Sequence, residues 1–506
     1  MISLNCCNTG SQTCCDDATR AEKQPWLARV AFVLLCMEAL FSLSYRSLYL
    51  SGRSPLVASI AGLCVFAVIG VLFPFRRSLL PPLGCVLTVP SIGNRAWLIF
   101  WLVFGLILRL AWVLRFPVTL KSDHLAYFQV AANMAQGYTG PGAYWPPGFS
   151  LFLAPFFMVF GAHLWVAQLC GLLSFAATYL LTYALAKHID CGLTARIAPM
   201  LVAIWPGYFT LAGINCKEVF LGALLPAFLF LYLKASDSRS VRASGIDSVL
   251  GHDGTRFRWG FVVPAGICMG FAALTQPGFL LFPSVIFGFE MLQARGFLKA
   301  ALRTTVFSFV MIAAILPWTY RNALVLHRFV LISTNGGSVF YRANNPLANG
   351  NYSAEGEVPL PQDEFAADQL GYKLADDWIA HHPVAFAALM VRKQVVFLGD
   401  DAVGAYETLK RDLNPSVVRY ALIKGVSNLF WLALWTVLLL GFPLLFRPGN
   451  WRLWFGLLFL PLVYQWVIDS VFESGPRHHV PYVAVISVLV SMVLSLALQR
   501  APKPNQ

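Results

Sequence analysis

Residues 147–160 read Pro-Gly-Phe-Ser-Leu-Phe-Leu-Ala-Pro-Phe-Phe-Met-Val-Phe, and this stretch decides the topology of the whole chain. It is apolar, but it is shorter than the roughly 20 residues that a membrane span needs. Pro146, Pro147 and Pro155 interrupt it further. If the stretch crosses a membrane, every later loop changes sides, so the charges of those loops discriminate between the two alternatives.

The basic loops resolve this ambiguity, because Lys and Arg gather in cytoplasmic loops. Arg76, Arg77 and Arg95 make the 74–95 loop cytoplasmic, so the span after it emerges outside. If 147–160 does not cross, the later basic loops also fall inside; they carry Arg239, Arg242, Arg256, Arg258, Arg295, Lys299, Arg303, Arg447, Arg452, Arg500 and Lys503. We therefore predict that 147–160 is re-entrant or interfacial and that both termini are cytoplasmic.

The composition independently indicates a membrane protein. Of the 506 residues, 58% are hydrophobic and only 12% are charged, with 40 Phe and 15 Trp. An ordinary soluble domain is about half apolar and about a quarter charged. These values exclude disorder, collagen, a small disulfide scaffold and a soluble enzyme. The net charge of +13 fits cytoplasmic loops and requires no nucleic acid.

Apolar runs predict an all-α polytopic membrane protein with about 12 transmembrane helices. The runs are 27–45, 55–73, 96–115, 162–187, 195–213, 217–234, 259–275, 277–293, 300–317, 426–446, 452–470 and 479–498. The predicted organisation is a cytosolic tail (1–26), two extra N-terminal helices (27–93), a membrane core (94–317) with an outer loop at 116–161, an outer helical segment (318–425) and C-terminal helices (426–506).

Four of the eleven cysteines, Cys6, Cys7, Cys14 and Cys15, lie in the polar N-terminal tail. Paired thiols can bind a metal or be acylated, but no His or further Cys pair completes a recognisable site. A disordered cytosolic tail is the simpler interpretation. The first apolar run lacks the cleavage site of a signal peptide, so we expect it to be retained as an anchor.

Two acids at the predicted outer surface are the candidates for chemistry, because a charge beside lipid costs several kcal/mol. Asp123 follows the third span, and Glu218 lies at the outer end of a later one. Asp123 can act as a general base for a hydroxyl or amine, with Tyr127 one helical turn later. The structural alternatives are a helix N-cap at Ser122 or Asp123 and a helix-start acid at Glu218 neutralised by Lys217.

Outward-facing cations complement these acids. Arg321 directly follows a span, and Arg477 precedes the last one. Because Arg can hold a phosphate through several donors, both are candidates for a lipid phosphate, and the alternative is that they anchor helix ends at the interface. Two adjacent His side chains point apart on a helix, which disfavours zinc at His478 and His479. We assign no metal ligand and no certain cofactor, and a divalent metal requirement stays open.

Several motifs together resemble a known family. Asp123-His124-Leu125-Ala126-Tyr127, with Tyr144-Trp145-Pro146-Pro147-Gly148-Phe149 after it, looks like the first outer loop of GT-C glycosyltransferases. The nearest branch is the family 39, dolichyl-phosphate-mannose-protein mannosyltransferase-like group, related to the lipid A aminoarabinose transferases. Further matches follow in order at 206–218, 317–322, 333–337, 344–346 and 378–383. The resemblance runs from about Asn94 to the C-terminus and leaves out the first two helices.

The resemblance implies a GT-C fold and the transfer of one sugar from a polyprenyl-phosphate carrier to a protein, lipid A or polysaccharide acceptor. The reaction would occur at the periplasmic face of a bacterial inner membrane. The implied catalytic residues are Asp123 as base and Glu218 as second acid. The implied donor-phosphate ligands are Arg321, Arg477 and Lys217, and the implied site-lining residues are His124, Tyr127, Tyr144 and His478. Where the mannosyltransferases carry an Asp-Glu pair, this chain has His124 second, which puts a second carboxylate there in doubt.

Two other functions compete with this interpretation. Twelve spans with both termini inside would suit a transporter. The essential acids of a transporter would lie mid-span, however, where Glu38 and Glu290 are the main ones. The two halves of the chain also have unlike loop patterns, whereas transporters often contain repeats. A polymerase or ligase of lipid-linked glycans would differ from the single-sugar transferase only in its diphosphate-linked donor.

Overall fold

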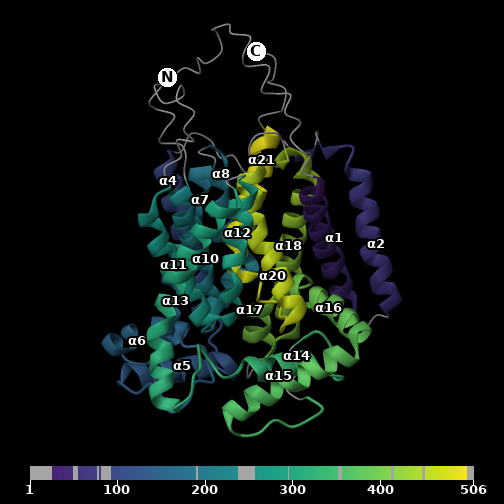
Figure 1. Ribbon diagram of the computed structural model, residues 1–506. Helices are drawn as coiled ribbons and strands as arrows, with labels where there is room; N and C mark the ends of the chain where they lie inside the picture. Colours follow the sequence, from purple (N-terminus) through teal and green to yellow (C-terminus); the bar gives the residue numbers. More distant parts are fainter. Residues whose placement is uncertain are drawn as a thin grey trace.

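The computed structural model describes residues 26–49, 55–76, 79–80, 93–189, 192–236, 257–293, 296–351, 356–411, 415–446 and 451–498. These residues form helices and no strand, which confirms the all-α prediction (Figure 1). The tail with Cys6, Cys7, Cys14 and Cys15 lies outside the described residues. So do several loop residues used to predict the sidedness, namely Arg77, Arg239, Arg242, Arg256, Arg295, Arg447, Arg500 and Lys503.

Within the described ranges, eight helices are long and apolar enough to cross a membrane. They are α1 (Trp26–Tyr49), α4 (Asn94–Arg115), α7 (Leu164–Ile189), α10 (Lys217–Ser236), α13 (Phe297–Leu326), α18 (Val417–Leu445), the continuous Trp451–Val471 that contains α19 and α20, and Val480–Leu498 that contains α21. A ninth is the pair Thr194–Ile204 and Pro206–Gly213, α8 followed by α9 and a 3-10 turn, which is bent by 51°.

The predicted count of twelve is not confirmed. The three remaining predicted spans coincide with helices shorter than the length criterion, α2 (Pro55–Leu72), α11 (Val262–Thr275) and α12 (Pro283–Leu292). Proline explains part of the difference for α12, because Pro277 and Pro283 each start a new helical segment. Proline lacks the backbone N–H that would continue the preceding helix.

The stretch that decides the topology forms α6 (Gly148–Phe160), a helix of 13 residues with Pro155 inside it. At about 1.5 Å per residue this helix is too short to cross a bilayer. Its buried residues Phe149, Leu153 and Phe157 recur every fourth position and pack against α5 (Ser122–Ala135). Figure 1 shows α5 and α6 together at the lower end of the molecule, as the re-entrant or interfacial interpretation requires.

The long outer segment lies at the same lower end. Its helices are α14 (Gly336–Ala343), α15 (Glu364–His381) and α16 (Pro383–Leu398), and Figure 1 shows them beside the ends of the long helices. The segment is shorter than predicted at both ends, because α13 continues to Leu326 and α18 begins at Val417. The two large loops therefore meet on one side of the bundle.

The core of the bundle surrounds α21 (Val483–Leu498), the most buried of the candidate spans. Small residues allow close packing around it: a Cβ added to Gly441 of α18 would lie 2.0 Å from Val493. On its α8 side, the hydroxyl of Thr194 donates to the backbone oxygen of Ser491 at 3.5 Å. This packing fixes the residues that immediately precede α21, which include Arg477 and His478.

Candidate functional site

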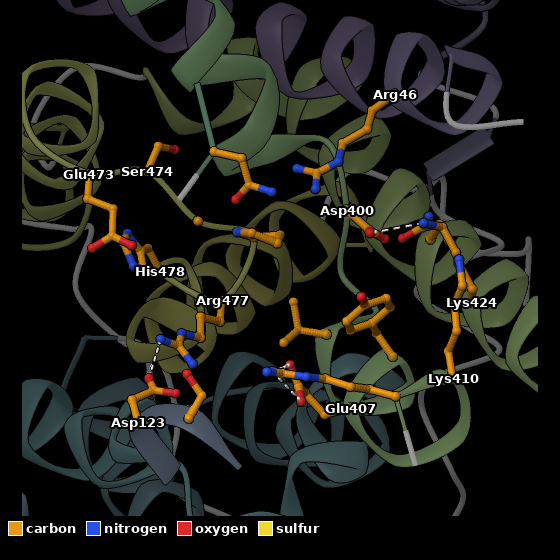
Figure 2. Close-up of a pocket in the computed structure, with 18 of the residues that line it drawn as sticks. Arg46, Asp123, Asp400, Glu407, Lys410, Lys424, Glu473, Ser474, Arg477 and His478 are labelled. Atoms are coloured by element: carbon orange, nitrogen blue, oxygen red, sulfur yellow. Dashed lines mark hydrogen bonds and ion pairs between the residues drawn. The ribbon is translucent and has the colours of Figure 1, made fainter. Parts of the chain in front are cut away.

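A cavity of about 1160 Å³ lies where the two outer loops meet the helix ends (Figure 2). Its walls come from the end of α1, the start of α5 and α10, residues 400–432, and the loop before α21. Six of the predicted site residues line it, namely Asp123, Tyr127, Tyr144, Lys217, Arg477 and His478. Glu218 and His124 contact this group without lining the cavity, and Arg321 lies elsewhere.

The two predicted acids share one cation. Arg477 donates from Nη2 to Asp123 Oδ2 at 2.5 Å (Figure 2), and its Nε lies 3.1 Å from Glu218 Oε1. The Glu218 side chain is only 1% exposed, and its other oxygen accepts from Cys216 Sγ at 2.9 Å. Residues that are far apart in sequence therefore form one ion-pair triad, Asp123–Arg477–Glu218.

The capping alternative for Asp123 is wrong. Helix α5 has Lys121 at its N-cap position and no side-chain hydrogen bond that caps it. Ser122 has a φ of 53°, which is uncommon for a residue other than glycine. The carboxylate of Asp123 is directed to Arg477 instead of to its own helix.

A reciprocal pair of hydrogen bonds fixes the start of α5. His124 Nδ1 lies 2.8 Å from the backbone oxygen of Asn215, and Asn215 Nδ2 donates to the backbone oxygen of His124 at 3.1 Å. Because a carbonyl oxygen only accepts, this contact assigns the Nδ1 proton. The other ring nitrogen, Nε2, then lies 3.9 Å from Asp123 Oδ1. His124 is thus a buried support of the Asp123 backbone that lies beside the cavity wall, and its predicted role in lining the site stays a prediction.

Lys217 makes no direct ion pair with Glu218 among the described contacts, although its charge acts on that carboxylate as the structural alternative expected. Its Nζ lies 3.5 Å from the Tyr127 hydroxyl and 5.6 Å from the centre of that ring. The contacts of the described residues give it no carboxylate within 4.0 Å. Lys217 therefore faces the cavity as a cation whose charge is not neutralised by a direct partner.

The electrostatics of the triad keep Asp123 ionised. Burial raises the pKa of the Asp123 carboxyl, but the charge and hydrogen bond of Arg477, with help from His124 and Lys217, hold this pKa well below its usual range. For Arg477, burial lowers the pKa of the guanidinium, and the two carboxylates raise it well above its usual value. Both partners stay charged across the physiological pH range.

The two histidines before α21 contact different acids. His478 Nδ1 lies 2.8 Å from Asp469 Oδ1, and His479 Nε2 lies 2.8 Å from Asp401 Oδ1. Burial lowers the pKa of His478, but Asp469 outweighs it and raises this pKa. Across the residues that the structure describes, no group of three or more His, Cys, Asp and Glu side chains is placed to hold a metal ion.

Arg321 does not lie where a phosphate in this cavity would need it. It sits inside α13, because that helix continues past Pro317. Its guanidinium donates to the backbone oxygens of Thr139, Gly140 and Gly142 at 2.7, 2.5 and 2.9 Å, respectively. Arg321 therefore fastens the loop before Tyr144, and its predicted role as a donor-phosphate ligand finds no support in its position.

Sequence reasoning missed the other end of the cavity. The charged residues that line it there are Arg46, Asp400, Glu407, Lys410, Arg411 and Lys424. The available signal was the density of charge in 400–424, directly before an apolar helix. For Arg46, the available signal was a cation at the end of an apolar helix. The family resemblance does not include that helix and so gave Arg46 no role.

Comparisons with known proteins give remote structural similarity only. No protein-family model matches the chain. No curated protein matches it by sequence. It is similar to the oligosaccharyltransferase of Archaeoglobus fulgidus in complex with Zn and sulfate (16% identity, TM-score 0.44, covering 78% of this chain and 48% of that one). It is also similar to ArnT from Cupriavidus metallidurans bound to undecaprenyl phosphate (14% identity, TM-score 0.41, covering 81% and 79%). The chain spans about half the length of the archaeal oligosaccharyltransferase structures that it matches.

Proposed function

We propose that the chain is a GT-C-type glycosyltransferase that moves one sugar from a polyprenyl-phosphate carrier to an acceptor at the periplasmic face of a bacterial inner membrane. The acceptor is a protein, lipid A or a polysaccharide. The observation that carries this proposal is an ionised carboxylate, Asp123, in the wall of a large cavity that also reaches an apolar, membrane-length helix, α18. Such a cavity suits a substrate that is a polar sugar at one end and a lipid at the other.

In the proposed reaction, Asp123 accepts the proton of the acceptor hydroxyl or amine. The acceptor atom then forms a bond to the anomeric carbon of the sugar. The bond between that carbon and the carrier phosphate oxygen breaks, and its electron pair leaves with the phosphate. Attack opposite the leaving group inverts the anomeric configuration. Cations that line the cavity stabilise the negative charge that develops on the phosphate. Lys217, for which the described residues supply no carboxylate within 4.0 Å, would help to keep Asp123 ionised.

Arg477 would orient the base, and Glu218 would keep Arg477 in place through the second ion pair. The same contact weakens Asp123 as a base, since it stabilises the ionised form.

The transporter alternative finds less support. Of the two mid-span acids, Glu290 is bound by Arg303 at 2.8 Å and by the Tyr232 hydroxyl at 2.8 Å. Glu38 accepts from Trp466 Nε1 at 2.8 Å. Partners of this kind are typical of acids that hold helices together. A glycan polymerase or ligase remains a second candidate, and the structure of the donor would separate it from the single-sugar transferase.

Mass spectrometry of envelope lipids, polysaccharides and glycoproteins tests the proposal. A strain that lacks the protein is compared with the same strain carrying wild type, Asp123→Asn or the control Asp376→Asn, an exposed acid of α15. We expect one glycan to lose a sugar in the deletion strain and to regain it with wild type and Asp376→Asn. Asp123→Asn should lower turnover roughly 100-fold to 10,000-fold at an unchanged membrane level. Full restoration by Asp123→Asn would remove Asp123 as base, and no glycan change in the deletion strain would favour the transporter.

A further inference from the structure

The end of the cavity opposite Asp123 is rich in cations. Figure 2 shows Arg46, Lys410 and Lys424 around Asp400, away from the Asp123–Arg477 pair. With Arg411, four cations line this end, together with only two carboxylates, Asp400 and Glu407. We call Arg46, Lys410 and Lys424 the basic group.

The carboxylates neutralise only part of this charge. Lys424 Nζ lies 3.0 Å from Asp400 Oδ2, and Arg411 Nη1 lies 3.0 Å from Glu407 Oε1. Arg46 donates to the backbone oxygen of Val396 at 2.7 Å, and Lys410 lies 5.8 and 5.4 Å from the ring centres of Tyr406 and Tyr420. Among the residues that the structure describes, neither Arg46 nor Lys410 has a carboxylate within 4.0 Å, so the basic group has charge available for an anion.

An apolar wall continues from the basic group. Val417, Ala421, Leu429 and Leu432 of α18 line the cavity, and their spacing places them on one face of the helix. Val417 and Leu429 are 70% and 66% exposed, and α18 is long and apolar enough to cross a membrane. A lipid chain that lies along this face would place its head group beside Lys424, which belongs to the same helix.

The first helix of the chain completes this end. Leu43, Ser44 and Arg46 of α1 line the cavity, and α1 packs against both α16 and α18. This helix lies outside the region that resembles GT-C glycosyltransferases. Its contribution to the cavity therefore comes from the contacts of this structure and not from the family pattern.

We propose that the basic group binds the phosphate of a lipid, with the chain of that lipid along α18, and that α1 supplies Arg46 to this site. If the proposed function holds, the lipid is the sugar carrier, and the sugar extends from the phosphate toward Asp123. Arg477 then orients the base instead of binding the phosphate, because its charge is already paired with the carboxylates of Asp123 and Glu218. The phosphate that leaves would stay bound at the far end of the same cavity.

Binding of undecaprenyl phosphate to the full-length protein in lipid nanodiscs tests this site without any sugar transfer. The variants are Lys410→Gln and Arg46→Gln. The matched control is Arg419→Gln, an exposed cation of α18 that does not line the cavity. Lys410 is exposed, so its replacement leaves no buried group without a partner. Undecaprenol and inorganic phosphate serve as competitors. They test whether the site recognises the intact lipid phosphate or only its lipid chain or its phosphate.

We expect both variants to bind undecaprenyl phosphate at least tenfold more weakly than wild type, whereas Arg419→Gln binds as wild type does. Undecaprenol and inorganic phosphate should compete poorly. Wild-type affinity in both Lys410→Gln and Arg46→Gln, or equal competition by inorganic phosphate, would overturn the site. If binding depends on the basic group but no glycan changes in the deletion strain, the lipid-phosphate site stands and the transferase proposal fails.

Discussion

The two ends of the cavity use charge in opposite ways. At the Asp123 end, one guanidinium lies between two carboxylates, and the Glu218 side chain is almost fully buried. At the α18 end, cations outnumber carboxylates, and Lys410 is exposed beside two tyrosines. Ion pairs on both sides of Arg477 hold the Asp123 carboxylate in one geometry, whereas surplus exposed charge can attract and bind an anion. The two ends therefore suit the two roles that we propose for them, chemistry at the Asp123 end and ligand binding at the α18 end.

The largest difference between the ends should appear when Arg477 is changed. Arg477→Gln leaves Glu218 buried without its cation, and losing one partner of a buried ion pair costs about 3–5 kcal/mol. We expect a lower midpoint of thermal unfolding in detergent and loss of turnover. Lys410→Gln is the matched variant at the other end and should keep the wild-type midpoint. Equal midpoints for the two variants would contradict the interpretation that the Asp123 end is more rigid than the α18 end.

The pH dependence of turnover should also differ between variants of the two ends of the cavity. Arg477 holds the pKa of Asp123 below its usual value of about 3.9. The acid limb of the activity profile should therefore lie below pH 4 in wild type, because Asp123 must be ionised to act as base. A depressed carboxyl pKa also stabilises the fold at pH values above the unfolded pKa, and this contribution is lost as the pH falls through the folded value.

Arg477→Lys tests the cause of this shift. A lysine carries one compact charge and cannot donate to two carboxylates through a planar fork. We expect its acid limb to move to higher pH, while that of Lys410→Gln stays in place. Measurement of kcat/KM between pH 3 and 8 checks both statements. An unchanged limb in Arg477→Lys would mean that Arg477 does not set the pKa of Asp123.

The sequence singled out more residues at the Asp123 end of the cavity than at the α18 end, for a physical reason. Asp123, Glu218 and Arg477 are isolated charges beside apolar runs, where a charge is costly and therefore conspicuous. Their pairing was not predictable, since Asp123 and Arg477 are 354 positions apart. Lys410 and Lys424 escaped notice because charge is ordinary in a polar outer segment.

Prediction of the fold from the sequence had similar limits. The charges of the later loops predicted that the short apolar stretch 147–160 does not span, and α6 is indeed too short to span. The helix ends were harder to predict. The apolar run was predicted to end at residue 317, whereas α13 accommodates Pro317 and continues to Leu326. Arg321 therefore lies inside this helix and donates to the loop before Tyr144.

The smallest effect on turnover is expected for a variant of Arg321, which does not line the cavity. Arg321→Ala removes the donors that hold the backbone oxygens of Thr139, Gly140 and Gly142. The loop that positions Tyr144 would loosen, so we expect turnover to fall by about twofold to tenfold, which corresponds to the roughly 0.5–1.5 kcal/mol of a typical hydrogen bond. Undecaprenyl phosphate should bind as it does to wild type.

Arg328→Ala is the matched control, because Arg328 is an arginine just after α13 whose contacts within the described part of the chain are Asp363, at 4.0 Å, and the Phe365 ring. It should change neither turnover nor binding. If Arg321→Ala instead weakened undecaprenyl phosphate binding as much as Lys410→Gln, the phosphate would have to reach the 139–142 loop. The division of the cavity into a chemical end and a lipid-phosphate end would then fail, since a residue outside both would hold the ligand.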